Sequence, residues 1–189
     1  MKIESFQEES LMILVNLTPV QAFDVGIHAA LLSLQMYNRL QKRTTIAFLK
    51  ACFLQLSQEE REIRWTLRAH RRDLFGSQEE SLSRDEVGEH FIYLKVGKLE
   101  DKQALIRAIT EAIRFKGAVA HFYERYADSI PSREARKFFQ IIAASGAYHA
   151  ATLAEQITLL QPLFLVAGPR RRLIEWEGQT RPSPRLIRE

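Results

Sequence analysis

The sequence predicts an all-α fold: a four-helix bundle made of two repeated helical hairpins, a long crossover connection between them, and a basic C-terminal tail. Three observations lead to this prediction. Apolar residues recur at three- and four-residue steps over long stretches, which is typical of amphipathic helices. Shifting the sequence by 86 positions aligns it with itself without a gap. The 189 residues, 46% of them hydrophobic, are enough to bury one sizeable core.

The internal repeat divides the chain into matching halves. It places Tyr37 on Tyr123 and Phe53 on Phe139. Two copies of one helical hairpin explain this alignment. The expected parts are a bundle at 1–167, with hairpins at about 19–75 and 101–161 and a crossover at 76–100, followed by a tail at 168–189.

The first helix is expected to begin after Thr18. Thr18 suits the N-cap, Pro19 suits the first helical position, and Gln21 completes a capping-box pattern. The helix should run to about Gln41. Lys42-Arg43 is then expected to form a short turn.

Thr44 is expected to open the second helix. Its buried face should carry Phe53, Leu56, Glu60, Ile63 and Leu67. Gly76 favours a C-cap near the end of this helix. Residues 76–100 then mix serine, glycine and charge, and a connection of this length allows the second and third helices to run parallel. The run Phe91–Leu94 packs against the bundle or forms a short element of its own.

The third and fourth helices are expected to join at Ser129-Ile130-Pro131. The apolar stripe of the third contains a lysine, Lys116, and that of the fourth has Gly146 and His149 at its centre. The fourth helix should start at Ser132 and end near Gln161-Pro162. The apolar run 163–166 has no obvious place in a four-helix core.

Two segments in each half resemble a known family, the rubrerythrin-type ferritin-like proteins. They are the AIxxxxxAxxFY-like stretch Ala112–Tyr123 with its weaker counterpart Gly26–Tyr37, and the sequences LSQEEREI and IAASGAYH. The resemblance covers about residues 19–161. It implies that each hairpin supplies a glutamate from its first helix and a Glu-x-x-His from its second, which together hold two iron ions.

Transferred residue by residue, the resemblance implies substitutions at most of the di-iron ligand positions. The former ligand positions are Ala30 and Lys116 on the first helices, Glu60 with Ile63, and Gly146 with His149. Two of these six keep a side chain that binds metal. A di-iron cluster needs several carboxylates for neutralisation and bridging, so this set is incomplete.

Lys116 and Glu60 are expected to share the space that the metals fill in the family. One hypothesis makes Lys116 an internal counter-ion for Glu60, with His149, Tyr37 or Tyr123 completing the hydrogen bonds. The other has Lys116 reach solvent between the helices.

Gly146 lies in a run of small residues, Ala143–Ala147. Glycine in mid-helix costs about 1 kcal/mol relative to alanine, which suggests close approach of another helix or of Tyr37. A residual metal site at Glu60 and His149, with help from His28 or His121, is the alternative use of this region.

The formal charge of +4 is concentrated in the tail. Six arginines and three glutamates from residue 168 onward give a local balance of +3. Arg170, Arg171, Arg172 and Trp176 are expected to bind a partner. The sequence argues against nucleic acid, because no basic stripe or known binding motif is present.

The remaining features point to a soluble, cytoplasmic protein. Cys52 is the single cysteine, so no intramolecular disulfide forms, and this fits a reducing compartment. No stretch approaches the roughly 20 apolar residues of a membrane span. Residues 1–18 lack the basic segment followed by a long apolar segment that is typical of a signal peptide.

The leading interpretation is a non-catalytic ferritin-like protein with a degenerate di-iron site, no cofactor and no enzymatic activity. It would act as a structural or protein-interaction component, as a homo-oligomer or a subunit of a larger assembly. The alternative is a metal-binding oxidoreductase that holds iron or another divalent metal at a rewired site around Glu60 and His149. A third hypothesis is association with nucleic acid through the tail.

Overall fold

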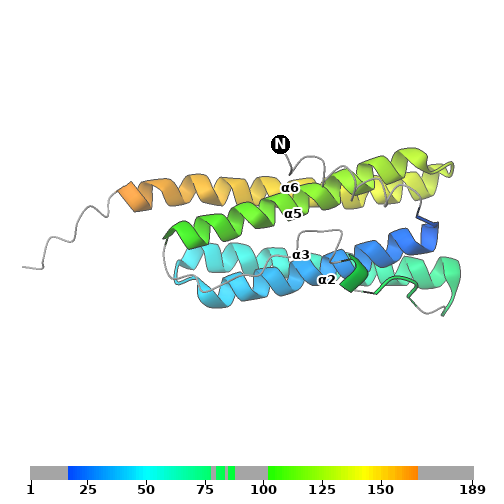
Figure 1. Cartoon of the computed structure of the whole chain (residues 1–189), viewed down its shortest axis with the longest axis horizontal. Helices are drawn as coiled ribbons and strands as arrows, with labels where there is room; N and C mark the ends of the chain where they lie inside the picture. Colours follow the sequence, from blue (N-terminus) through cyan, green and yellow to red (C-terminus); the bar gives the residue numbers. More distant parts are fainter. Residues whose placement is uncertain (1–16, 78–79, 84, 88–101, 166–189) are drawn as a thin grey trace, which may run out of the picture.

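The fold is the all-α bundle that the sequence predicts. The computed structural model describes residues 17–77, 80–83, 85–87 and 102–165, and these contain no strand. Four long helices make up the bundle (Figure 1): α2 (Pro19–Arg43), α3 (Ala47–Phe75), α5 (Lys102–Ser129) and α6 (Arg133–Leu165).

The four helices are arranged as two hairpins that lie against each other. α2 packs closely on α3 and α5 on α6, while α2 meets α5 and α3 meets α6 across the bundle. Figure 1 shows α3 and α5 running in the same direction. The chain between them therefore has to return along the length of the bundle, which explains why the crossover is long.

The start of α2 is the predicted capping box. The hydroxyl of Thr18 accepts from the Gln21 backbone N–H at 3.4 Å, and the Gln21 side chain accepts from the Thr18 N–H at 2.9 Å. The predicted end was wrong, because α2 continues through Lys42-Arg43. The N–H of Thr44 donates to the Leu40 carbonyl, so Thr44 caps α2 and does not open α3.

A glycine sets the end of α3, whereas a proline does not set the end of α6. α3 ends at Phe75, and Gly76 takes a positive φ of 69° as its C-cap, as predicted. α6 was expected to end near Pro162, but it extends to Leu165. Proline so close to a helix end removes only one late backbone hydrogen bond, so the helix tolerates it.

Aromatic rings join the two hairpins in the core. Phe23 of α2 lies 5.1 Å from Phe139 of α6 between ring centroids, and Phe139 stacks on Tyr123 of α5 at 5.5 Å. Such pairs add to the stabilisation from burial. The packing therefore connects α2 to both helices of the second hairpin.

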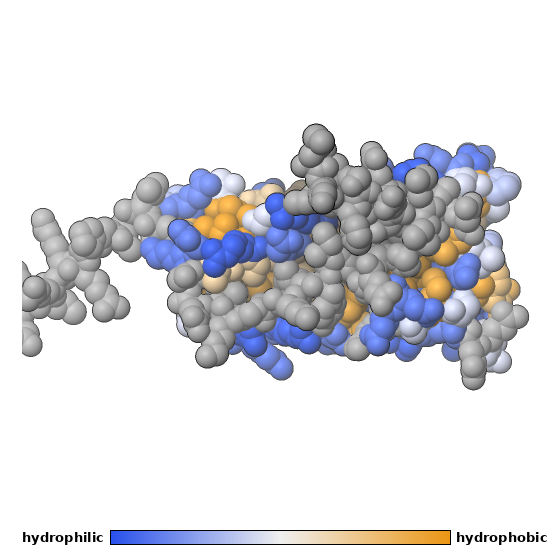
Figure 2. Space-filling view, in the orientation of Figure 1, coloured by the Kyte–Doolittle hydropathy of each residue, from blue (hydrophilic) through white to orange (hydrophobic). Residues whose placement is uncertain are grey.

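Where Figure 2 shows the described residues, most of their surface is hydrophilic, with hydrophobic patches near both ends of the bundle. Within the described helices, none combines the length and apolar character that a membrane span requires. The predicted tail at 168–189, with Arg170, Arg171, Arg172 and Trp176, lies outside the described residues, as does the run Phe91–Leu94.

Candidate functional site

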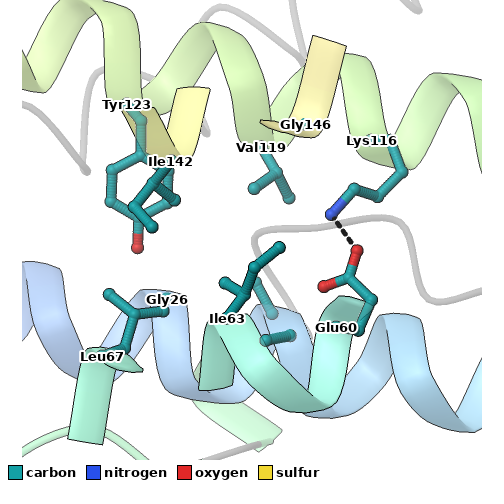
Figure 3. Close-up of a pocket in the computed structure, with 11 residues that line it drawn as sticks. Gly26, Glu60, Ile63, Leu67, Lys116, Val119, Tyr123, Ile142 and Gly146 are labelled. Carbon is teal, nitrogen blue, oxygen red and sulfur yellow. Dashed lines mark hydrogen bonds and ion pairs between the residues drawn. The ribbon is translucent and has the colours of Figure 1, made fainter. Parts of the chain in front are cut away.

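The six positions that the resemblance aligns with di-iron ligands come together inside the bundle, and all four helices contribute to them. Five of them line one internal cavity of about 10 Å³ (Figure 3): Ala30, Glu60, Ile63, Lys116 and Gly146. The sixth, His149, contacts the Glu60 carboxylate. The register taken from the repeat therefore identifies one region of the structure.

Lys116 and Glu60 form a buried ion pair between the hairpins. The Lys116 Nζ lies 2.6 Å from Glu60 Oε1, and the two residues are 3% and 1% exposed. Nζ also lies 3.5 Å from the hydroxyl of Ser33, which itself donates to the Ala29 carbonyl. The alternative in which Lys116 reaches solvent was wrong, because its side chain ends on the carboxylate of α3.

His149 lies between two glutamates. Its Nδ1 is 2.7 Å from Glu60 Oε1, and its Nε2 is 2.8 Å from Glu59 Oε2. Both contacts are hydrogen bonds only when both ring nitrogens carry a hydrogen, because an ionised carboxylate only accepts. The ring therefore bridges the carboxylates of two neighbouring residues of α3.

Sequence reasoning missed Glu59. It stands among exposed charged residues of α3, and its side chain is 31% exposed. Its position next to Glu60 was the available signal. The two nitrogens of the His149 ring point in different directions, so a ring that contacts Glu60 through one nitrogen can contact the adjacent Glu59 through the other.

Electrostatics keep Glu60 ionised. Burial alone raises the pKa of its carboxyl group, but the nearby Lys116 ammonium and the His149 ring outweigh burial and hold the pKa below its ordinary value. Both partners use Oε1, and Oε2 has no hydrogen-bond partner among the described residues. The cavity beside this carboxylate has roughly the volume that one water needs.

Of the three side chains expected to complete the hydrogen bonds, His149 contacts Glu60, whereas neither repeat-related tyrosine donates a hydrogen bond to the cluster among the described residues. Tyr123 donates instead to the Ala22 carbonyl at 3.0 Å, and no described residue accepts from the Tyr37 hydroxyl. Burial raises the pKa of both phenols, helped at Tyr37 by the charge of Glu60. Both tyrosines are therefore neutral core residues at ordinary pH.

Gly146 brings α6 close to α5. A Cβ at this position would lie 3.2 Å from the Ala120 Cβ and 3.3 Å from the Ala120 backbone. The sequence predicted close approach either of another helix or of Tyr37 at this position. The structure shows the approach of another helix, α5. A side chain at this position, including the glutamate that the resemblance implies for the family, would require Ala120 to give way by a few tenths of an ångström.

These residues do not fit a di-iron centre. Only Glu60 and His149 carry donor atoms among the six positions, and the Glu60 carboxylate already binds the Lys116 ammonium. That permanent positive charge repels a metal ion at the same carboxylate. In the described part of the chain, no group of three or more His, Cys, Asp or Glu side chains is arranged to hold a metal.

The two additional histidines of the metal alternative lie elsewhere. His28 Nε2 lies 3.0 Å from Glu80 Oε2 on the crossover, and His121 is 53% exposed beside Glu124. The described contacts of these two histidines are therefore with Glu80 and Glu124, and neither is with Glu60 or His149.

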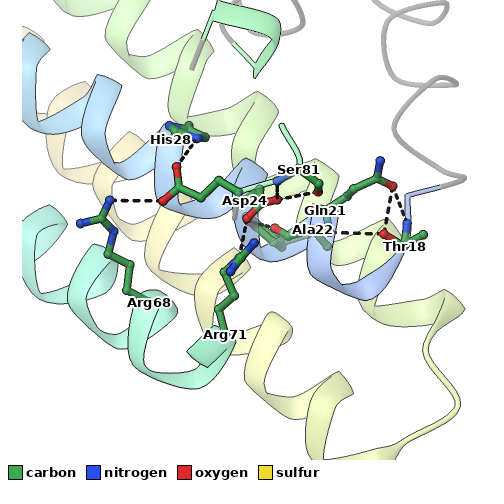
Figure 4. Close-up of polar contacts among 10 residues, drawn as sticks. Thr18, Gln21, Ala22, Asp24, His28, Arg68, Arg71 and Ser81 are labelled. Carbon is green, nitrogen blue, oxygen red and sulfur yellow. Dashed lines mark hydrogen bonds and ion pairs between the residues drawn. The ribbon is translucent and has the colours of Figure 1, made fainter. Parts of the chain in front are cut away.

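A second buried polar cluster ties the crossover to the first hairpin (Figure 4). The fully buried Asp24 carboxylate accepts from Arg71 Nε at 2.6 Å and from both the N–H and the hydroxyl of Ser81 at 2.7 Å. Sequence reasoning missed this cluster. Its contacts span 47 and 57 residues, so no local pattern connects them.

Comparison with known proteins supports the fold. The family described as Rubrerythrin matches residues 31–157. No curated protein matched the chain. A solved structure of a hypothetical protein from Pyrococcus furiosus superposes with a TM-score of 0.71 at 20% sequence identity, covering 81% of this chain and 96% of that one. At that identity the superposition shows the shared fold.

Proposed function

Because the chain belongs to the rubrerythrin family, we propose that it is a non-catalytic ferritin-like member in which an internal ion-pair cluster takes the place of the di-iron centre. It serves as a structural or protein-interaction component and needs no cofactor. We propose the cytoplasm as its compartment, because a chain with a single cysteine has no intramolecular disulfide that would need an oxidising environment.

One observation carries the proposal. The Lys116 ammonium, 3% exposed, lies 2.6 Å from Glu60 Oε1 at a position where the family places a metal ligand. An ammonium supplies the positive charge that the metals would supply, and it does so without leaving the chain. Glu60 therefore has its counter-charge in the folded protein alone.

The cluster also supplies a link between hairpins. In the family, carboxylates from both hairpins converge on metal ions, whereas here the carboxylates of α3 meet nitrogen atoms of α5 and α6 directly. Removing one partner from a buried pair leaves an uncompensated charge, which typically costs 3–5 kcal/mol. The link therefore makes the mutual placement of the hairpins specific.

The other ionisable groups near the site support a lack of catalysis. Burial and the charge of Glu59 raise the pKa of the Cys52 thiol to about 11, so it stays protonated and a poor nucleophile. Tyr37, whose pKa burial also raises, is a neutral phenol. Neither group is activated for covalent chemistry at physiological pH.

Metal analysis of the full chain purified from its native host tests the proposal. We expect iron, manganese and zinc far below one ion per chain. The variants Lys116→Glu and Lys116→Met form a matched pair: both remove the ammonium, but only the first adds a carboxylate, so only the first should gain metal. Near-stoichiometric metal in the unaltered protein would instead support the oxidoreductase with a rewired site at Glu60 and His149.

The interaction role is tested separately. Affinity purification with and without residues 168–189 shows whether the predicted tail residues Arg170, Arg171, Arg172 and Trp176 recruit a protein. Recovery of the same proteins by both forms would contradict a tail-mediated role. If nucleic acid is recovered instead, its binding should weaken steeply with added salt.

A further inference from the structure

The outer face of α6 differs from that of an ordinary surface helix. From Phe138 to Ala154 it contains no Asp, Glu, Lys or Arg, although Ile141 is 66% exposed and Tyr148 54% exposed. Solvent-facing sides of helices are normally charged. The corresponding side of α5 follows that rule, with Arg107, Glu111 and Arg114 exposed or partly exposed.

The exposed residues on this face form a regular seam. They alternate in steps of four and three residues, which is the a/d spacing of a helix that packs along another helix. All six are exposed: Lys137, Ile141, Ala144, Tyr148, Ala151 and Glu155. They lie opposite the buried side of α6, which carries Phe139, Gly146 and Leu153. Figure 1 shows α6 along one edge of the bundle.

The seam is complementary to itself when reversed. Its members lie in pairs at equal distances on either side of residue 146: Lys137 with Glu155, Ile141 with Ala151, and Ala144 with Tyr148. If two copies of α6 run antiparallel with a two-fold axis at the level of residue 146, each positive charge meets a negative one and each large side chain meets an alanine. A two-fold interface requires this reciprocity, because residue i of one copy contacts residue j of the other and the reverse.

We infer that two copies of this chain associate through α6, antiparallel, around a two-fold axis level with Gly146. The seam from Lys137 to Glu155 is about 27 Å long at 1.5 Å per residue. Alanines at Ala144 and Ala151 let the helices approach closely, and Ile141 and Tyr148 fill the space beside them. The central layers are apolar, and the charge pairs at both ends set the antiparallel direction.

This inference is independent of the metal question, because the seam lies on the side of α6 away from the Glu60 cluster. Loss of the dimer would leave the metal content unchanged, and an occupied metal site would leave the seam intact. The two proposals therefore fail separately.

Sedimentation velocity on the full-length protein tests the dimer. We expect a dimer at micromolar concentration and a monomer for Ala144→Glu, which puts a charge at the centre of the seam. Ala51→Glu is the matched control, because Ala51 is an exposed alanine on α3; it should remain dimeric. Circular dichroism checks that both variants keep their helices. A monomeric unaltered protein, or equal behaviour of the two variants, would overturn the inference.

A charge exchange tests the antiparallel direction. Lys137→Glu or Glu155→Lys alone places like charges together at both ends, and each should weaken the dimer roughly tenfold. The double variant Lys137→Glu/Glu155→Lys restores both opposite-charge pairs and should return the dissociation constant to near its original value. If the double variant is weaker than either single one, the two helices do not pair in this way.

Discussion

At the candidate site, the first hairpin, α2 with α3, contributes the Glu60 carboxylate, whereas the second, α5 with α6, contributes the Lys116 ammonium and the His149 ring. At each repeat-related pair of ligand positions one member is polar and the other is not: Lys116 and Ala30, Glu60 and Gly146, His149 and Ile63. A symmetric metal site would need acids on both sides. The unequal division lets the hairpins attract each other directly.

The repeat-related tyrosines of the two hairpins also differ in their hydrogen bonds. Tyr123 reaches the Ala22 carbonyl because Gly26 has no side chain to obstruct its hydroxyl. The repeat places Ala112, which has a Cβ, where the first hairpin has Gly26, and the Tyr37 hydroxyl has no described partner.

The strongest test of the division of charge removes the acid. Glu60→Gln leaves the Lys116 ammonium buried without its counter-charge, and we expect a loss of about 3–5 kcal/mol in the free energy of unfolding. Glu59→Gln, at a partly exposed site, should cost about 1 kcal/mol or less. Urea denaturation at neutral pH measures both. Equal losses would mean that the buried carboxylate has no special role.

Adding a methyl group at Gly26 tests whether Tyr123 needs the space beside this glycine. Gly26→Ala should cost about 1–3 kcal/mol, because the new Cβ meets the Tyr123 hydroxyl and lies 2.9 Å from a Leu67 methyl group. Adding Tyr123→Phe should recover part of this loss. Thermal denaturation of the single and double variants measures the recovery, and a double variant no more stable than Gly26→Ala would contradict the account.

Two mid-helix glycines of the second hairpin should respond in opposite directions. Gly117→Ala meets nothing within 4 Å and should stabilise the protein by up to about 1 kcal/mol through helix propensity. Gly146→Ala gains the same propensity but presses on the Ala120 backbone, so a net loss is expected. Unfolding in urea compares them. Stabilisation by both would show that α5 and α6 have room to separate.

The smallest expected effect is a dependence of the free energy of unfolding on acidic pH, which is absent near neutral pH. The pKa of Glu60 in the folded protein lies below the ordinary value of 4.5. Its contribution to stability is therefore present above about pH 4.5 and is lost as the pH falls from there through the folded pKa. Unfolding free energies between neutral pH and pH 3 measure this loss. Glu60→Gln should show a shallower decline, and an identical decline would assign the acid sensitivity to other carboxyl groups.

Local patterns were enough to predict most of the fold. Helical periodicity, the Thr18 capping box and Gly76 depend on neighbours in sequence, and they placed the helices correctly. The errors lie at helix ends. Thr44 and Pro162 have side chains compatible with either side of a boundary, and the final hydrogen bonds and packing decide between them.

The candidate site was predictable only where the repeat and the family register marked it. These identified Glu60, Lys116 and His149, which the structure brings into contact. Asp24 and Arg71 had no such marker, because their pairing depends on how α2 and α3 face each other. Buried pairs of this kind depend on tertiary packing, which sequence spacing does not encode.

A double-mutant cycle between the hairpins tests the central claim most directly. Urea unfolding of Lys116→Met, Glu60→Gln and the double variant gives the coupling energy between the two side chains. If the ammonium holds the carboxylate in place of a metal, the double variant loses less than the two single losses together, with a coupling of at least about 2 kcal/mol. Losses that simply add would contradict the claim that this ion pair joins the hairpins.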